Sequence, residues 1–202
     1  GRDGGEGHCL AYYSYKDVEK LEKFLSGKPV AEQEIGFALL QEVVAYAETS
    51  MSRRKFLLHY FGEEFDSETG EGADMDDNVR NPKVKVEAKD QVKKLLEVVR
   101  DTKHLYKSKE IIFTLIGRVN ATIKAHKTDG QRFFGTGKDF EERYWMALIR
   151  QVLVDGMLFK DIETYGILNV TPRGLDVIKS PSSFMMSEDH VYSQNEDDAI
   201  VT

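Results

Sequence analysis

Cysteine is nearly absent from this sequence, and long apolar runs are absent altogether. The 202 residues include one cysteine, Cys9, which excludes a disulfide framework and any zinc cluster built from several cysteines. Because Cys9 precedes the apolar stretch LAYYSY, we expect it to be buried. No apolar run approaches the about 18 residues that span a membrane. With no charged-then-apolar signal pattern at the start, we expect a cytoplasmic protein without a membrane partner.

Sequence motifs of catalysis are also missing. The phosphate-binding pattern G-x-x-x-x-G-K-[ST] does not occur, and GTGKD at 135–139 lacks its leading glycine. No Ser-His-Asp or Cys-His arrangement stands out. The five histidines show no metal-ligand spacing: His8, His59, His104, His126 and His190. We therefore expect neither a catalytic centre nor a bound cofactor within this chain.

What the sequence does have is charge that is segregated along the chain. The formal net charge is −7, but residues 62–78 hold eight acids and residues 181–202 hold five, both without a lysine or arginine. The rest of the chain is therefore net positive, and residues 103–150 hold ten Lys or Arg against five Asp or Glu. A basic body with an acidic loop and an acidic tail favours a polyanion partner, with a solvated helical surface as the alternative.

Hydrophobic periodicity predicts a mainly α-helical chain with a small β-hairpin. In the first half we expect a short strand at 10–15 and helices at 17–25, 31–49 and 53–61. The apolar face of the second of these helices comprises Ile35, Leu39, Leu40, Val43, Val44 and Ala47. The sequence NPK at 81–83 then marks a boundary, because Pro and a change of charge coincide there.

The second half predicts helices at 86–102, 109–117 and 139–155, the last capped by Asp139 with Glu142 in a capping box. Strands at 157–162 and 167–171 follow, and Thr171-Pro172 begins a last helix that ends near Lys179. From Pro181 the polar, acidic tail is expected to be disordered. Three helices, a hairpin and a closing helix are the element order of a winged-helix domain.

Winged helices mostly bind DNA, and some only mediate protein contacts, so the fold leaves both functions open. Basic residues around the long helix would contact phosphates, and an aromatic at the hairpin tip could stack on a base. The residues expected to contact DNA are Arg118, Lys124, Lys127, Lys138, Arg143 and Tyr165.

The acidic loop can be tested as a calcium site. Asp74, Asp76 and Asn78 match positions 1, 3 and 5 of an EF-hand loop. Position 6 requires glycine and position 12 a bidentate glutamate, whereas this sequence has Val79 and Lys85 there. The mismatches argue against an EF-hand site.

Three blocks of the sequence resemble RecQ DNA helicases. GRDG at 1–4, with the YYSY strand and the DVEKL helix after it, resembles the end of the second motor lobe. SRRKFLLHYFGE at 52–63 resembles the helix of the RecQ zinc module, which begins C-R-R in the family. FFGTGKD at 133–139, YWMALIRQVLVDGML at 144–158 and ILNVTPRG at 167–174 resemble the RecQ C-terminal (RQC) winged helix. The resemblance points to the C-terminal part of a bacterial RecQ-family ATP-dependent DNA helicase.

The resemblance divides the chain into four parts. Residues 1–28 would be the trailing end of the second motor lobe, 29–83 a helical zinc-module-like subdomain with the acidic loop, 84–180 the winged-helix (RQC) domain and 181–202 a disordered acidic tail. Four cysteines bind zinc in the family, and the matching positions here are Ser52, Glu71, Asp74 and Asp77. Because oxygen ligands do not form the thiolate site that zinc prefers, we expect no zinc, and a platform held by its apolar faces.

For the parent protein the resemblance implies ATP-dependent 3′-to-5′ DNA unwinding in repair, recombination or replication, with ATP and Mg²⁺ as cofactors. This chain has only Arg2 as a remnant of the last helicase motif, so by itself it should bind DNA and hydrolyse no ATP. Expected partners are duplex, fork or junction DNA, bound without sequence preference, and a single-strand-binding protein, in the bacterial nucleoid. Tyr165 would lie where the strands part. A transcriptional regulator or a protein-interaction module is the competing interpretation.

Overall fold

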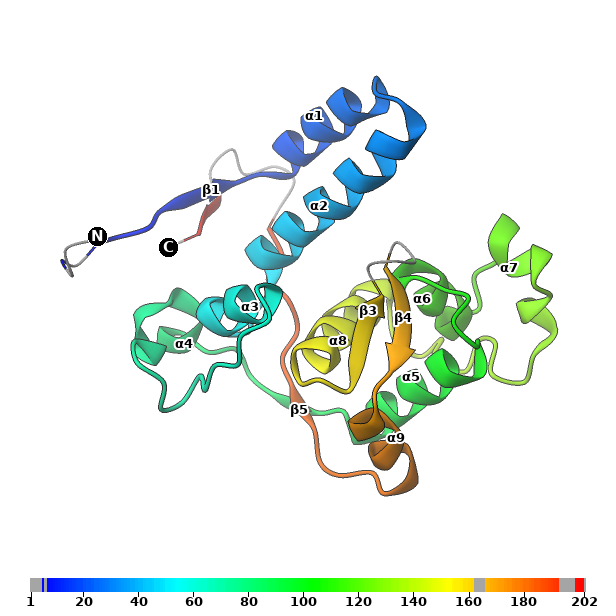
Figure 1. The fold of residues 1–202 in the computed structure, drawn as a ribbon. Coiled ribbons are helices and arrows are strands. Elements are labelled where there is room, and N and C mark those ends of the chain that lie inside the picture. The colour runs from blue at the N-terminus through cyan, green and yellow to red at the C-terminus, as the bar shows by residue number, and fades with distance from the viewer. Residues whose placement is uncertain (1–4, 6, 162–165, 193–198, 202) are drawn as a thin grey trace. The chain divides into compact units, whose positions relative to one another are not determined.

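The computed structural model describes residues 5, 7–161, 166–192 and 199–201. They form two compact units: one comprises the chain up to Pro82 together with the segment from His190, and the other is Lys83–Asp189. Within the described residues, helices dominate both units and the strands pair in twos (Figure 1). The predicted fold class, mainly α with a small hairpin, is confirmed.

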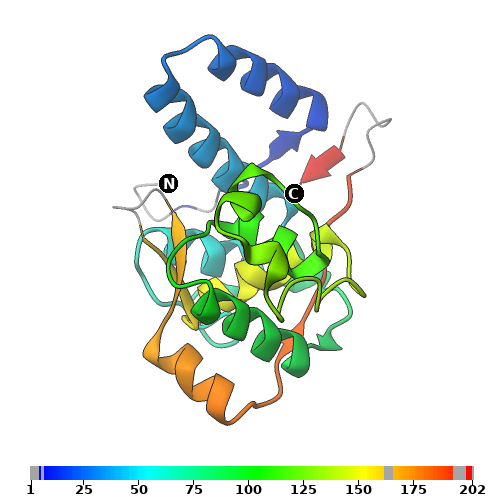
Figure 2. The same cartoon turned by 90° about the vertical axis from the view of Figure 1, so that its right-hand side faces the viewer.

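The first unit is built around a helical hairpin. Strand β1 (Ala11–Tyr13) leads into α1 (Tyr15–Ser26), and α2 (Val30–Glu48) returns beside it, as Figure 1 and Figure 2 both show. The hydroxyl of Ser14 caps α1 by accepting a hydrogen bond from the Asp17 amide at 3.3 Å. Strand β6 (Ala199–Val201) pairs antiparallel with β1, so segments from both ends of the chain form one small sheet.

Packing between α1 and α2 buries only a narrow stripe. Val18, Leu40 and Val44 form the buried cluster. The predicted apolar face of α2 is therefore only partly right, because Ile35, Leu39 and Val43 are between 52% and 61% exposed. They lie outside the stripe that the neighbouring helix covers. Cys9 is exposed rather than buried, since it precedes β1 and packs under neither helix.

The remainder of the first unit is irregular but ordered. Helix α3 (Arg53–Tyr60) is followed by the acidic segment, which contains the 3₁₀ turn η1 (Ala73–Met75) and begins α4 (Asp77–Arg80). Asp76 caps α4, its Oδ1 accepting from the Val79 amide at 3.0 Å. The acidic segment therefore has defined local structure where the sequence predicted only a loop.

The second unit has the predicted winged-helix order. Strand β2 (Val86–Glu87) precedes α5 (Lys89–Asp101) and α6 (Ser108–Ile116), and α8 (Glu142–Val154) completes the three helices around the core. Trp145 and Leu148 of α8 are fully buried there. Strands β3 (Leu158–Asp161) and β4 (Ile167–Val170) form the hairpin, with Leu158 opposite Val170. Helix α9 (Pro172–Lys179) closes the unit, capped by Thr171 as predicted.

Two features between α6 and α8 differ from the prediction. The connection between them from Arg118 to Lys138, which we call the basic connection, contains α7 (Ala121–Ala125), which Asn120 caps, and the turn η2 (Thr128–Gly130). Asp139 does not cap the long helix. Helix α8 begins at Glu142 with Glu141 in the N-cap position, and no side chain bonds to its first amides.

The predicted disorder from residue 181 is wrong for residues 181–192. Strand β5 (Met185–Met186) pairs with β2 and buries Met186 completely. Ser187 exchanges two hydrogen bonds with the Gln151 side chain, at 2.6 and 3.2 Å. Asp189 forms a buried ion pair with Arg150. These apolar and polar contacts therefore order residues 181–192 despite the acidic composition of the segment. Of the helices in the described ranges, none is long and apolar enough to cross a membrane.

Candidate nucleic-acid interface

A glycine-rich turn fixes the start of the basic surface against the core of the second unit. The amides of Gly135 and Gly137 donate to the carbonyls of Thr114 and Leu115 at 2.8 and 2.7 Å. Trp145 Nε1 in turn donates to the Gly137 carbonyl at 3.0 Å. A Cβ atom at Gly137 would lie 2.6 Å from the Trp145 ring, so only glycine fits this close approach. The turn therefore holds the chain rigidly just before Lys138.

Arg118 and Lys124 follow α6 and lie on the surface, but each has an acidic neighbour. Arg118 is 61% exposed, its Nη1 lies 3.3 Å from Glu142 Oε2, and its guanidinium lies 4.6 Å from the ring centre of Phe113. Lys124 is hydrogen-bonded to Asp129, and this bond lowers the pKa of the Asp129 carboxyl. Because exposed ion pairs contribute only about 0–1 kcal/mol, a phosphate can replace either carboxylate.

Lys127 and Lys138 are also exposed. Lys127 stands between α7 and η2 with a left-handed backbone, φ 54°. Lys138 precedes α8, whose N-terminus already carries the carboxylates of Glu141 and Glu142. These carboxylates complement the positive end of the helix dipole, so the helix start offers less to a phosphate than the sequence predicted.

Arg143 lies close to Lys83. Burial first, and the charge of Arg143 to a smaller extent, lower the pKa of Lys83, while two neighbouring carboxylates act in the opposite direction. Arg118 thus lies beside the start of α8, whereas the charge of Arg143 in the first turn of this helix acts on Lys83. Tyr165 at the hairpin tip and Arg2 lie outside the described residues.

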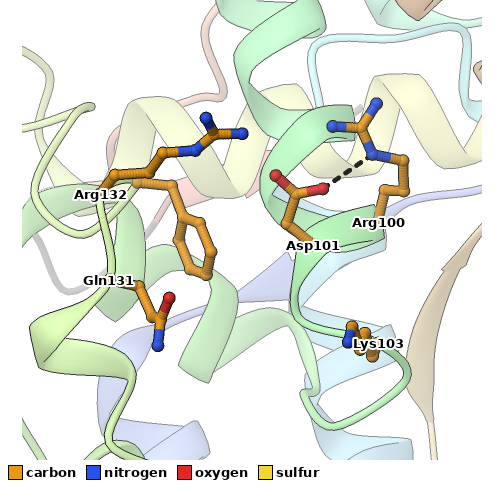
Figure 3. A pocket seen from close by; sticks show the side chains of 6 residues that line it. Arg100, Asp101, Lys103, Gln131 and Arg132 are labelled. Atoms are coloured by element: carbon orange, nitrogen blue, oxygen red, sulfur yellow. Dashed lines mark hydrogen bonds and ion pairs between the residues drawn. The ribbon is translucent and has the colours of Figure 1, made fainter.

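A hollow in the second unit gathers basic residues that the sequence did not single out. Two segments line it, residues 100–103 at and just after the end of α5 and residues 131–133, as Figure 3 shows. Its volume is about 590 Å³. The lining residues are Arg100, Asp101, Lys103, Gln131, Arg132 and Phe133.

The charges of this hollow are only partly neutralised. Arg100 Nε pairs with Asp101 Oδ1 at 2.8 Å. Neither Lys103 nor Arg132 has an ion-pair partner within the part of the chain that the structure describes. Lys103 and His104 both have left-handed backbones, φ 51° and 61°, which costs about 1–2 kcal/mol per residue and turns the chain sharply after α5. No local sequence signal identifies the hollow, because its two walls are about thirty residues apart in the chain.

The corner between α2, α3 and α4 contains two of the predicted former zinc positions, Ser52 and Asp77. Ser52 Oγ accepts from the Lys55 amide at 3.3 Å and donates to Asp76 Oδ2 at 2.9 Å. The Arg53 amide donates to the same carboxylate at 3.1 Å. Asp77 binds the Arg53 guanidinium, Nη2 to Oδ2 at 2.8 Å, with both side chains largely buried. Burial acts to lower the pKa of Arg53, but the contacts with Asp77 outweigh it and the pKa is raised.

Asn78 joins this corner to the returning end of the chain. Its Nδ2 donates to the carbonyls of Thr49 and Met51, both at 2.7 Å. Its Oδ1 lies 2.7 Å from Nε2 of His190, whose amide donates to the Glu48 carbonyl, also at 2.7 Å. We call the set Ser52, Arg53, Asp76, Asp77 and Asn78, with His190, the polar corner.

The residues present do not fit a zinc ion. Ser52 and Asp77 are committed to protein partners, and the side chains of Glu71 and Asp74 are exposed. Across the described ranges, no three or more His, Cys, Asp or Glu side chains are grouped so that they could hold a metal. Hydroxyl and carboxylate oxygens also lack the softness of the thiolates that structural zinc sites use.

Comparison with known proteins gives two consecutive family matches. The RecQ zinc-binding family matches residues 15–78, and the RQC domain family matches residues 82–195. ATP-dependent DNA helicase Q-like 4B of Arabidopsis thaliana is 23% identical over 93% of this chain and 18% of its own length. ATP-dependent DNA helicase RecQ of Pasteurella multocida is 26% identical over 78% of this chain and 24% of its own. ATP-dependent DNA helicase hus2/rqh1 of Schizosaccharomyces pombe is 44% identical over 33% of this chain.

The chain spans about a fifth to a quarter of the length of the first two relatives. The RQC match covers more than half of the chain and coincides with the unit that has the winged-helix order. The chain therefore belongs to the RQC domain family, within the RecQ helicases.

Proposed function

We propose that this chain is the DNA-binding region of a RecQ-type ATP-dependent 3′-to-5′ DNA helicase, and that its winged helix grips duplex DNA at forks or junctions. The observation that carries the proposal is the exposed basic connection, Arg118 to Lys138, on a domain that belongs to the RQC family. Its cations are either unpaired among the described residues or held in weak surface pairs. Phosphate contacts of this kind position a protein on DNA without reading sequence.

Equilibrium binding to a fork, a blunt duplex and unrelated duplex sequences, each over a salt series, tests this proposal. We expect similar affinity for all sequences and a steep loss of affinity with salt. Changing Lys127 and Lys138 to Gln should reduce the slope of log K against log salt by about 0.9 for each lost phosphate contact.

The matched control is Lys85→Gln with Lys89→Gln, which removes two exposed charges, one just before β2 and one at the start of α5. The control should bind duplex DNA like the unchanged protein. Preference for one sequence would instead indicate a transcriptional regulator, and absence of binding at low salt would indicate a protein-interaction module.

For the parent protein we propose the cofactors ATP and Mg²⁺ and a role in repair, recombination or replication. This chain has no phosphate-binding loop and should hydrolyse no ATP, with or without DNA. A phosphate-release assay on this chain checks the point, and turnover above background would contradict it. Assignment to a bacterial nucleoid stays a prediction, since the relatives include plant and yeast proteins. Contact with a single-strand-binding protein also stays a prediction.

We also propose that the zinc-module-like part folds without zinc. The sequence predicted a platform held by its apolar faces, whereas the polar corner connects the same segments through hydrogen bonds and a buried ion pair. Metal analysis of protein purified without chelator should find no stoichiometric zinc, and EDTA should leave the melting temperature unchanged. One zinc per chain, or a large loss of stability in EDTA, would overturn the proposal.

A further inference from the structure

We propose that the hollow between α5 and residues 131–133 binds one nucleotide unit of a single DNA strand. The hollow shares residues 131–133 with the basic connection, but its other wall, Arg100 to Lys103, lies outside that connection. The inference rests on the proposed DNA-binding function. Nothing in the family matches or in the sequence patterns assigns it.

The cations of the hollow suit a phosphate. Lys103 and Arg132 are exposed, stand on opposite walls and have no ion-pair partner among the described residues, whereas Arg118 and Lys124 of the basic connection are each paired. A guanidinium presents paired donors to a phosphate, and an ammonium adds a point charge. The left-handed backbone at Lys103 fixes the direction in which its side chain projects from the main chain.

The other lining groups suit a base that is not paired. Phe133 offers a half-buried aromatic surface, and the exposed amide of Gln131 can both donate and accept a hydrogen bond. Aromatic side chains stack on bases of single strands, whereas the bases of a duplex are already stacked on each other. Four of the six lining residues are exposed, so the hollow is open enough for a polymer to pass over it.

Fluorescence anisotropy with labelled oligo(dT) and with a hairpin duplex tests the inference on the whole chain. The double variant Lys103→Gln, Arg132→Gln should weaken oligo(dT) binding on the order of 10-fold at 0.1 M salt and lower the salt slope by about 0.7 for each lost contact. Duplex affinity should fall clearly less than oligo(dT) affinity, because Arg132 is one of several cations on the basic connection. An abasic strand of the same length should bind the unchanged protein more weakly than oligo(dT).

The matched control is again Lys85→Gln, Lys89→Gln. Lys89 begins α5 and Arg100 lies near its end, so the two residues are about 16 Å apart along the helix axis. Equal losses in the control and the hollow variant, or equal losses for strand and duplex, would overturn the inference. Oligo(dT) affinity that does not change in the hollow variant would also overturn it. Failure of the unchanged protein to bind duplex would instead contradict the proposed function.

Discussion

At the scale of single residues, the side chain of Asn78 connects several segments of the first unit. It is 4% exposed, and its amide makes three hydrogen bonds to segments before α3 and to His190. Changing it to Ala leaves two carbonyls and a ring nitrogen without this partner, each in a poorly hydrated place. We expect Asn78→Ala to reduce the free energy of unfolding by about 2–4 kcal/mol.

Urea unfolding followed by circular dichroism measures this loss. Asn81→Ala is the matched control, because Asn81 is exposed and only its backbone amide bonds to Asp77. The control should change stability by no more than about 0.5 kcal/mol. Equal effects of the two substitutions would mean that the hydrogen bonds of Asn78 do not hold the polar corner together.

The ionisation of Tyr144 should make the free energy of unfolding depend on pH in the alkaline range. Burial first, and then the charge of Glu188, raise its pKa from 10.0 to about 12. The unfolded chain therefore loses this proton at lower pH than the folded one. The contribution of Tyr144 to stability is complete below pH 10 and is lost as the pH rises through about 12.

Tyr144→Phe removes this ionisation and keeps the ring, which stacks on Phe140 at 4.2 Å between centres. Between pH 10 and pH 12, the unfolding free energy of the variant should fall less steeply than that of the unchanged protein. Urea midpoints at pH 9, 10 and 11 measure the difference. Parallel pH profiles would contradict the assignment.

At the scale of elements, the turn before α8 depends on Gly137. A methyl group there would meet the Trp145 ring at 2.6 Å and the Leu115 side chain at 3.1 Å. Gly137→Ala should therefore cost about 1–3 kcal/mol through overpacking. Gly130→Ala is the control, because no atom lies within 4 Å of its added methyl. Unfolding followed by the fluorescence of Trp145 measures both, and equal stability of the two variants would contradict the packing argument.

Elements with strong periodicity could be predicted from the sequence, and those held by distant contacts could not. The hydrophobic periodicity over α5 and the Thr171-Pro172 start of α9 predicted helices at nearly the observed positions. Strand β5 has two residues and exists because it pairs with β2, about a hundred residues earlier in the chain. No local pattern encodes such a partner.

The candidate site, too, could be predicted from the sequence only in part. The sequence identified the cations of the basic connection as individual charges. It did not give their pairing, because Glu142 reaches Arg118 from another element and Asp129 reaches Lys124 across a turn. The hollow was missed altogether, since Lys103 and Arg132 come to line one hollow only in the folded unit.

At the scale of the whole molecule, the chain leaves the first unit at Pro82 and returns to it at His190. The return is fixed by the His190 amide on the Glu48 carbonyl at 2.7 Å and by the Tyr192 hydroxyl on the Ala47 carbonyl at 3.2 Å. Tyr192 also meets the edge of the Tyr13 ring, 5.3 Å between centres. The acidic composition of this segment predicted disorder, whereas a few specific contacts hold it against the first unit.

Truncation after Asp189 should therefore loosen the first unit and spare the second. The matched control ends after Tyr192, so it loses β6 but keeps the contacts of His190 and Tyr192. Hydrogen exchange read by mass spectrometry should show protection falling about 10-fold or more in residues 44–53 and 76–80, where about 1.4 kcal/mol corresponds to each factor of ten. In α5 protection should stay as it is, because its core lies in the other unit. If both truncated chains lost the same protection, β6 and not the polar corner would hold the returning segment.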